Sequence, residues 1–307
     1  MRFLVTGGAG FIGSHLVEHL LQTGHQVRVL DNFTTGKREN LAFGAGNSGL
    51  EISDGDIRDN AAVAAVMKGI DGVFHEAALV SVPKSVEQPA LSFDINVKGT
   101  FTVFEAARQA GVRRVVYASS SAIYGNNADL PLSETAAPLP VSPYGLDKLY
   151  TEHLGALYQS LYGQQMLALR YFNVFGPRQD PGSPYSGVIS IFVDRLKSGT
   201  APTIYGDGEQ TRDFVFVGDI VQANIKAMFA DYSGFRVFNV GCGRQTTLNQ
   251  LFSLLRDLAG KSVTPNYAAP RVGEVKYSVS DISKIQRELA YSPEFSLPEG
   301  LRLLLAV

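Results

Sequence analysis

The fold is decided by the stretch Thr6-Gly7-Gly8-Ala9-Gly10-Phe11-Ile12-Gly13, which carries glycines at positions 7, 10 and 13. A short apolar strand pattern, residues 2–6, leads into it, and an amphipathic helical pattern follows. Glycines in this place let the backbone turn tightly, approach a pyrophosphate and pack a helix on a strand. The helix N-terminus adds unpaired N–H groups and a partial positive charge. The stretch therefore predicts a dinucleotide-binding turn.

Strand and helix patterns continue to alternate through the first half of the chain. Apolar residues keep helical spacing over 12–21, and Gly24 stands where a glycine commonly ends a helix. Such alternation predicts the α/β class, with a Rossmann-type, doubly wound parallel sheet and helices on both faces. The candidate strands are residues 2–6, 26–30, 50–53, 72–75, 114–118 and 166–171.

The second half is less regular. Loop composition fills residues 176–184, after which a helix is expected near 188–198. The alternation returns with a strand at 214–217, a helix at 219–229 and a strand at 235–240. We predict a dinucleotide-binding Rossmann domain from residues 1–173 plus 214–243. A smaller α/β domain, which would bind the substrate, is expected from 174–213 plus 244–307.

Composition is typical of a soluble globular protein. The 307 residues are 45% hydrophobic and 18% charged, and the net charge of -2 gives no basic footprint for nucleic acid. The single cysteine, Cys242, excludes a disulfide framework and favours a reducing compartment. The first residues lack a signal-peptide layout, and no apolar run reaches the roughly 18 residues of a spanning helix. We therefore expect a cytoplasmic protein without nucleic-acid or membrane partners.

Two histidines on the first predicted helix have a spacing that metal sites use. His15 and His19 stand four residues apart, but no third ligand accompanies them. His75 closes a buried strand pattern and is expected to be structural. We predict no metal site.

An acidic residue at the end of the second strand selects the cofactor. Asp31 follows Gly13 by eighteen residues, where a carboxylate can accept hydrogen bonds from the adenosine ribose and repel a phosphate. This favours NAD over NADP, although Lys37 and Arg38 lie close by. Two weaker candidates follow the third and fourth strands, Asp56-Ile57 at the adenine and the small-residue turn Ala77-Ala78.

Tyr144 and Lys148 are the residues that suggest catalysis. Their offset of four inside a predicted helix places phenol and ammonium on one face. A free tyrosine has a pKa near 10, so action as a base at neutral pH requires a lowering of about three units, part of which a nearby cation supplies. The alternative is an ordinary helix that carries one aromatic residue and one solvated lysine.

The order of these motifs resembles the extended short-chain dehydrogenase/reductase superfamily, and within it the NAD-dependent nucleotide-sugar 4-epimerases. The resemblance rests on the glycine loop, Asp31, Asn96, Ser119-Ser120-Ser121, Tyr144 and Lys148. It extends over almost the whole chain through four further stretches, residues 118–125, 170–177, 206–214 and 271–274. It implies epimerisation of a UDP-hexose at C4 through a transient 4-keto sugar.

Residues beside the serine separate the subfamilies. Sugar 4,6-dehydratases carry an Asp-Glu pair after the catalytic hydroxyl residue, whereas this chain has Ser121 and Ala122. Without a carboxylate, elimination lacks its acid, and reversible oxidation at one carbon remains. A nucleotide-sugar decarboxylase or dehydratase, a UDP-uronic acid 4-epimerase and a non-catalytic dinucleotide sensor stay as alternatives.

The resemblance assigns roles residue by residue. Tyr144 is the base at the 4-hydroxyl, Lys148 binds the nicotinamide ribose and favours the phenolate, Ser120 hydrogen-bonds the same oxygen, and Ser121 holds a neighbouring hydroxyl or relays the proton. The implied cofactor contacts are Gly7, Gly10, Phe11, Ile12, Gly13, Asp31, Asn32, Thr34, Thr35, Gly36, Asp56, Ile57, Ala77, Ala78, Asn96, Ser119, Tyr144, Lys148, Tyr171 and Phe172. The implied substrate contacts are Lys84, Ser85, Ser120, Tyr144, Asn173, Val188, Tyr205, Arg212, Arg271, Glu274 and Ser278.

Two further predictions concern which sugar is accepted and how the chain assembles. Ser278 lies seven residues past Arg271, where the family carries a residue that bounds the sugar's 2-substituent; a tyrosine there would exclude an N-acetyl group. We therefore predict interconversion of UDP-GlcNAc and UDP-GalNAc, with UDP-Glc and UDP-Gal also accepted. The helices near 97–110 and 144–162 are apolar on more than one side, which predicts a homodimer built from them.

Overall fold

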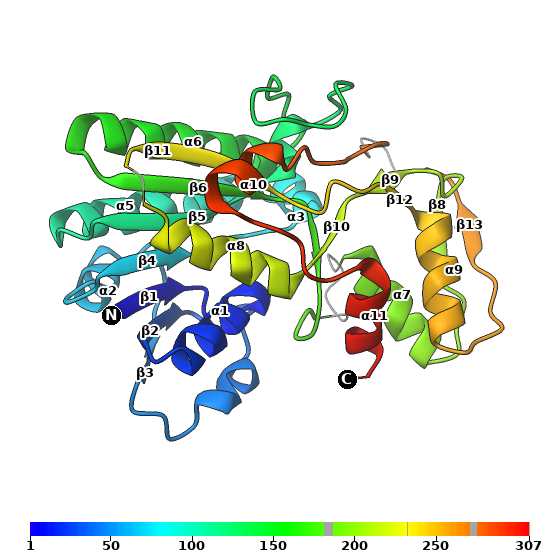
Figure 1. Ribbon diagram of the computed structural model, residues 1–307, viewed down its shortest axis with the longest axis horizontal. Helices are drawn as coiled ribbons and strands as arrows, with labels where there is room; N and C mark the ends of the chain where they lie inside the picture. Colours follow the sequence, from blue (N-terminus) through cyan, green and yellow to red (C-terminus); the bar gives the residue numbers. More distant parts are fainter. Residues whose placement is uncertain (181–186, 232, 271–274, 307) are drawn as a thin grey trace.

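The computed structural model describes residues 1–180, 187–231, 233–270 and 275–306. Its centre is a seven-stranded parallel sheet in the order β11-β6-β5-β4-β1-β2-β3 (Figure 1). The strands are β1 (Arg2–Thr6), β2 (Gln26–Asp31), β3 (Leu50–Asp54), β4 (Gly72–His75), β5 (Arg114–Ser120), β6 (Gln165–Tyr171) and β11 (Phe235–Val240). The predicted doubly wound α/β fold is confirmed.

Helices cover both faces of this sheet, so successive side chains of one strand enter different cores. In β1, Phe3 and Val5 belong to one buried cluster and Leu4 belongs to the other. The first face is covered by α1 (Phe11–Gln22), the 3-10 helix η1 (Arg38–Gly44), α8 (Val217–Phe229) and α10 (Ser283–Leu289). The second face is covered by α2 (Asn60–Val66), α5 (Thr100–Gln109) and α6 (Pro143–Tyr162).

The start of α6 is fixed locally, which matters because Tyr144 lies in its first turn. Ser142 caps the helix by accepting a hydrogen bond from the backbone N–H of Gly145, and Pro143 occupies the first helical position. The helix ends at Gly163, whose φ of 68° is left-handed. The predicted helix over 144–162 is thereby confirmed.

The helix expected from residue 97 begins earlier. Two short helices, α3 (Val82–Glu87) and α4 (Pro89–Phe93), precede a π-helical turn, η2 (Asp94–Gly99), which continues directly into α5. A π turn inserts an extra residue and changes which side chains face the sheet. Periodicity of 3.6 residues could not predict that change.

A smaller lobe gathers beside the carboxyl ends of the strands (Figure 1). Its buried cluster comes from α7 (Val188–Lys197), α9 (Leu248–Leu258), α11 (Leu297–Leu305) and short paired strands. These pairs are β7 (Asn173–Phe175) with β10 (Phe214–Phe216), β8 (Thr203–Tyr205) with β13 (Asn266–Ala268), and β9 (Thr211–Arg212) with β12 (Thr246–Thr247).

Two segments differ from the expected layout. The strand predicted at 214–217 does not join the main sheet, because β10 pairs with β7 instead. Helix α10 falls in the range expected for the smaller domain, yet Ile285 and Leu289 pack into the core of the large sheet. The division into residues 1–173 plus 214–243 and the remainder stays a prediction.

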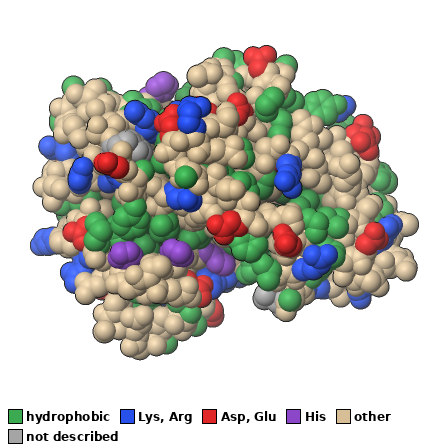
Figure 2. Space-filling model, in the orientation of Figure 1, with side chains coloured by type: hydrophobic (Ala, Val, Ile, Leu, Met, Phe, Trp, Pro, Cys, Tyr) green, Lys and Arg blue, Asp and Glu red, His purple; other side chains and the backbone are tan. Residues whose placement is uncertain are grey.

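Acidic and basic side chains are interspersed over the face shown in Figure 2. This agrees with the balanced charge of the sequence. Within the described ranges, every helix falls short of the length and apolar character that crossing a bilayer requires.

Candidate active site

The glycine loop forms a backbone cradle at the N-terminus of α1. Gly7 has a φ of 69°, and a Cβ there would lie 2.7 Å from the backbone nitrogen of Ala77. Gly10 precedes the helix and offers no side chain as a cap. The first N–H groups of α1 therefore stay available to an anion. The close backbone packing that glycine permits here and the N–H groups at the start of α1 suit a dinucleotide pyrophosphate.

Asp31 lies at the end of β2, beside this cradle. Its carboxylate accepts hydrogen bonds from the backbone N–H groups of Ala9 and Phe33, each at 2.9 Å. Burial raises the pKa of this carboxyl, and the two N–H donors oppose that rise. A Cβ on Gly36 would lie 2.8 Å from an Asp31 oxygen, so glycine leaves the carboxylate its place.

Lys37 and Arg38, the two basic residues near Asp31 that could favour NADP, each have a carboxylate partner. Lys37 lies 3.2 Å from Asp180, and Arg38 lies 2.9 Å from Asp54. Arg38 also stacks over the ring of Phe33. Both side chains are therefore engaged, which strengthens the preference for NAD that Asp31 indicates.

The carboxylate of Asp56, the predicted adenine contact, is bound by an arginine. Arg58 grips both carboxylate oxygens, at 2.9 and 2.8 Å, and Asn32 donates a third hydrogen bond at 2.9 Å. These donors hold the pKa of Asp56 well below its usual range. Asp56 thus orients Asn32, whose side-chain oxygen accepts from the backbone of Thr34. Arg58 could not be predicted from the sequence, because a lone arginine after a strand is usually a surface residue.

The predicted catalytic residues come together at the end of β5 and the start of α6. Ser120 hydrogen-bonds the phenol of Tyr144, and its Oγ accepts from the backbone N–H of Ala122 at 3.1 Å. Lys148 lies with Nζ 5.9 Å from the centre of the Tyr144 ring and donates to the carbonyl of Ala118 at 2.8 Å. Ser121 opens the 3-10 helix η3 (Ser121–Tyr124) directly after Ser120.

The protein groups around Tyr144 raise the pKa of its phenol. Burial raises the pKa of Tyr144 to about 12, with contributions from the charges of Glu76 and Asp147, while the hydrogen bond from Ser120 opposes them. Burial also lowers the pKa of Lys148 to about 8. The sequence showed the lysine beside the phenol but not the carboxylates that face both groups.

Ser119, a predicted cofactor contact, has its side chain engaged in a buried network. It is 2% exposed, and its hydroxyl donates to Glu152 at 2.6 Å. The same carboxylate forms a two-pronged ion pair with Arg170, at 2.8 and 2.6 Å, and both side chains are buried. Glu152, one helical turn after Lys148, thereby links α6 to both β5 and β6.

Asn96 and Ser85, two further predicted contacts, are also hydrogen-bonded to protein groups. Asn96 lies in the π turn η2, is 1% exposed and exchanges hydrogen bonds with the backbone of Leu79, at 2.8 and 3.1 Å. Ser85 is fully buried, accepts from the backbone N–H of Tyr144 at 3.2 Å and donates to the carbonyl of Val82. Both brace the walls of the site, because their polar atoms are already engaged by protein groups.

A carboxylate that was not predicted lies directly after β4. Glu76 accepts a hydrogen bond from the phenol of Tyr171 at 2.9 Å, and Asn224 donates to that phenol at 2.7 Å. Burial raises the pKa of Glu76 to about 7. The side chain of Tyr171, predicted to touch the cofactor, is therefore engaged with Glu76, and Phe172 is buried beside Tyr124.

The candidate substrate residues outside the Ser120–Tyr144 cluster lie on several separate segments. The pairing of β7 with β10 places the backbone N–H of Asn173 3.0 Å from the carbonyl of Asp213, next to Arg212. Ser278 is 7% exposed. Tyr205 ends β8, Val188 begins α7 and Lys84 lies within α3. Arg271 and Glu274 lie outside the described residues.

Asp213 ties three of these segments together. Its carboxylate accepts from the backbone N–H groups of Cys242, Gly243 and Ser280, at 2.8, 3.0 and 3.1 Å. It follows Arg212 directly, and Ser280 lies two residues past Ser278. Of the predicted diphosphate and sugar residues, the segments that carry Arg212 and Ser278 are thereby held to the end of β11.

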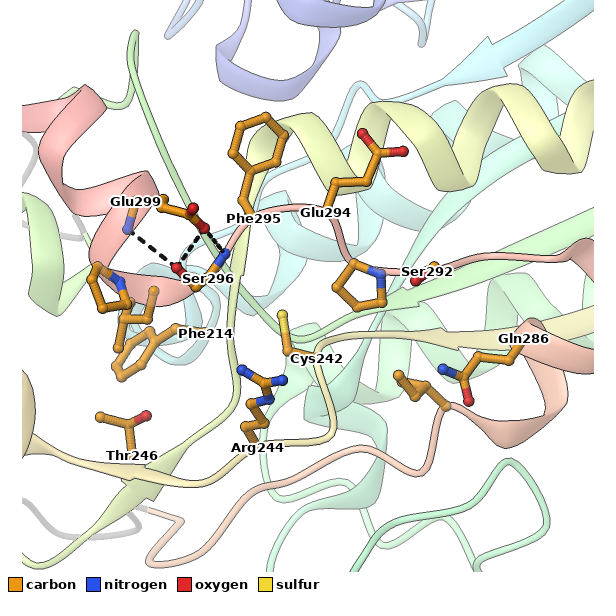
Figure 3. A pocket seen from close by; sticks show the side chains of 14 residues that line it. Phe214, Cys242, Arg244, Thr246, Gln286, Ser292, Glu294, Phe295, Ser296 and Glu299 are labelled. Atoms are coloured by element: carbon orange, nitrogen blue, oxygen red, sulfur yellow. Dashed lines mark hydrogen bonds between the residues drawn. The ribbon is translucent and has the colours of Figure 1, made fainter.

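The cavity in Figure 3 borders these segments at Cys242 and Thr246. It measures about 450 Å³ and is lined between the end of β11 and residues 292–299, with Cys242, Arg244 and Glu294 at its wall. Burial and two carboxylates raise the pKa of the Cys242 thiol to about 12, so the thiol is unreactive near neutral pH. The described residues that line it include none of the predicted site residues.

Comparisons with known proteins agree with this arrangement. A family model described as the NAD dependent epimerase/dehydratase family matches residues 3–241. A UDP-glucose 4-epimerase of Mycolicibacterium smegmatis is 39% identical over 304 residues, which cover 98% of this chain and 96% of the relative. The match thus extends through both lobes.

Two solved structures superpose over nearly the full length. A UDP-glucose 4-epimerase from Thermotoga maritima, solved with UDP-glucose, has a TM-score of 0.95 and 41% identity, covering 100% of this chain and 98% of that one. A UDP-N-acetylglucosamine 4-epimerase from Methanobrevibacter ruminantium, solved with UDP-N-acetylmuramic acid, has a TM-score of 0.95 and 40% identity, covering 99% and 97%.

Proposed function

The chain belongs to the NAD-dependent epimerase/dehydratase family, and on that premise we propose that it interconverts UDP-GlcNAc and UDP-GalNAc, with UDP-Glc and UDP-Gal also accepted. It is an NAD-dependent isomerase of UDP-sugars, the activity that its relatives and structural neighbours carry in their names. The choice of sugar pair and the roles of individual residues are the parts that we propose.

One observation carries the proposal most directly. Ser120, Tyr144 and Lys148 form a compact proton-transfer cluster, and the positions after Ser120 hold Ser121 and Ala122 in place of carboxylates. Elimination of water or carbon dioxide requires an acid beside the reacting carbons. A site with a base, a hydroxyl donor and a cation suits reversible oxidation at a single carbon.

We assign Tyr144 the role of general base and acid. Its Oη removes the proton of the sugar 4-hydroxyl and later returns it. Ser120 donates a hydrogen bond to the same phenol and is placed to hold the substrate oxygen. NAD, when bound, supplies the acceptor and donor of the hydride at C4, and its oxidised form brings a positive charge. Lys148 holds the nicotinamide ribose and adds a second positive charge near Tyr144. The phenolate is therefore favoured only once the site is loaded, because burial alone keeps Tyr144 neutral.

The sugar pair follows from a small residue. Ser278 stands where a tyrosine is expected to exclude an N-acetyl group, and Asp213 fixes its segment through Ser280. The UDP-N-acetylglucosamine 4-epimerase at 40% identity supports the acetylated pair. The relatives named for UDP-glucose support acceptance of the smaller pair.

Incubation with UDP-GlcNAc and with UDP-Glc, followed by separation of the nucleotide-sugars, tests the function. We expect C4 epimers of unchanged mass from both, with the higher kcat/KM for UDP-GlcNAc. A product that has lost water or carbon dioxide would identify a dehydratase or decarboxylase, and turnover of UDP-glucuronic acid alone would identify a uronic acid epimerase. A clear preference for UDP-Glc would contradict the sugar assignment.

Ser278→Tyr tests the residue behind that preference. The phenol would fill the space of the N-acetyl group, so kcat/KM for UDP-GlcNAc should fall at least about tenfold while UDP-Glc turnover persists. The retained turnover of UDP-Glc also shows that the variant folds. Ser278→Ala is the matched control and should keep both substrates; equal losses for both substrates in Ser278→Tyr would contradict the role of this position.

We also propose that the chain forms a homodimer through α6 and α5. Leu146, Tyr150, Leu157 and Leu161 follow one face of α6 at helical spacing, and each is at least half exposed. Phe101 of α5 adds to the exposed apolar surface. An unpaired apolar face of this kind is typical of a homo-oligomer interface.

Light scattering should report a dimer for the wild type and a monomer for Leu157→Arg, because the charge would be buried without a partner. Leu303→Arg is the control, since Leu303 is equally exposed but lies on α11. A monomeric wild type, or dimers in both variants, would contradict this interface.

A further inference from the structure

Glu76 is a carboxylate at the active site that the proposed chemistry does not use. It follows the last residue of β4, and its backbone lies against Gly7 of the phosphate loop. Its Oε1 accepts a hydrogen bond from Tyr171, which Asn224 holds in turn. The carboxyl is therefore fixed in place by residues of β6 and α8.

The charged groups that face Glu76 are those of the proposed chemistry. Lys148 interacts with it electrostatically from α6, and so does Tyr144. From β6 it meets the phenol of Tyr171, and from β4 itself its neighbour is His75. Burial and the charge of Lys148 lower the pKa of His75 to about 3, so this imidazole stays neutral near pH 7.

Two further carboxylates interact electrostatically with Tyr144 or Lys148. Asp147 interacts with both Tyr144 and Lys148, and Glu152 interacts with Lys148. Asp147 accepts from Ser92 and Asn96, and Glu152 pairs with Arg170. Among the described residues, Glu76 accepts one side-chain hydrogen bond, from the neutral phenol of Tyr171, whereas Asp147 accepts two from neutral groups and Glu152 pairs with an arginine. Glu76 therefore has the fewest hydrogen-bond donors of the three carboxylates.

We propose that Glu76 is a positioning residue whose charge sets the pH range in which Tyr144 can act as a base while Lys148 stays protonated. This inference rests on the proposed roles of Tyr144 and Lys148. A negative charge at Glu76 opposes the phenolate and supports the ammonium. Both effects raise the pH at which the neighbouring group loses its proton.

The sign of the effect follows from those two interactions. Burial raises the pKa of Glu76 to about 7, so this carboxyl is negatively charged above neutral pH. Glu76→Gln removes that charge but keeps the shape and a hydrogen-bond acceptor for Tyr171. Tyr144 then ionises at lower pH, and Lys148 also loses its proton at lower pH. The three groups titrate as a coupled set, so the shift appears in the apparent pKa values of turnover.

The test is the pH profile of kcat for the NAD-loaded enzyme with UDP-GlcNAc, and with UDP-Glc in parallel. In Glu76→Gln both limbs should move toward acid by about one pH unit. Glu51→Gln removes an equal charge from an exposed position on β3 and should leave both limbs in place. A lower plateau with unmoved limbs would show a structural role and overturn the proposal.

A readout without turnover tests Glu76 itself. The infrared carbonyl stretch of a protonated buried carboxyl should titrate near neutral pH in the wild type and vanish in Glu76→Gln. Tyr171→Phe should move that titration to higher pH, because the phenol's hydrogen bond lowers the pKa of Glu76. Absence of a band that depends on Glu76 would overturn the proposal.

Failure of the role proposed for Glu76 can be distinguished from failure of the proposed epimerase function. If Tyr144→Phe is inactive while Glu76→Gln keeps the wild-type limbs, the role of Glu76 is wrong and the proposed function stands. If the wild type produces no 4-epimer, the proposed function fails and takes the role of Glu76 with it.

Discussion

Replacement of Tyr144 by phenylalanine is expected to lower kcat by about a thousandfold, because its phenol is the group that we assign to move the proton of the sugar 4-hydroxyl. The substitution deletes one oxygen. The ring stays in its buried position, and the backbone N–H of residue 144 still donates to Ser85. The loss should therefore fall on kcat, with little change in KM.

Steady-state kinetics with UDP-Glc and UDP-GlcNAc measure that loss, and the NAD content of the purified variant shows that the cofactor site is intact. Tyr150→Phe is the matched control, because Tyr150 lies on the exposed face of the same helix. It should keep wild-type turnover. Unimpaired turnover in Tyr144→Phe would refute the proposed base.

The second large effect is on stability. Glu152→Ala should lower the free energy of unfolding by about 3–5 kcal/mol, because it leaves the Arg170 guanidinium buried without its carboxylate. The pair is bidentate, with both side chains less than a tenth exposed. Ser119 and Tyr124 also lose order, since they hydrogen-bond the two partners.

Urea unfolding of the ligand-free protein at fixed concentration measures this effect, since bound cofactor and dimerisation both add apparent stability. Glu51→Ala breaks the half-exposed pair with Arg28 and should cost far less. The double variant Glu152→Gln with Arg170→Met should recover part of the loss, because it removes the unpaired charge. Equal losses for Glu152→Ala and Glu51→Ala would contradict the buried-pair account.

The sequence was informative where function depends on one element. The glycine loop, Asp31 and the offset between Tyr144 and Lys148 each lie within a single strand, turn or helix. Their geometry follows from φ/ψ preferences and helical periodicity, which are local properties. The resemblance to nucleotide-sugar 4-epimerases added Ser120 by its distance from Tyr124, and the structure places it beside Tyr144.

Short elements were harder to predict for a related reason. The paired strands of the smaller lobe are two or three residues long, so they carry too little periodicity to assign a partner. The π turn η2 likewise changes the register of a helix without changing its composition. The strand at 214–216 therefore seemed to belong to the main sheet, although it pairs with β7.

By itself, then, the sequence determined the doubly wound sheet, the cofactor loop and the phenol-lysine pair, since each is specified by residues close in the chain. Only the tertiary structure decided what surrounds that pair. Glu76 interacts with Tyr144 and Lys148 from directly after β4, far from both in the chain, whereas Asp147 and Glu152 share α6 with the pair. Ionisation depends on burial and on charges in space, and those are properties of the assembled fold.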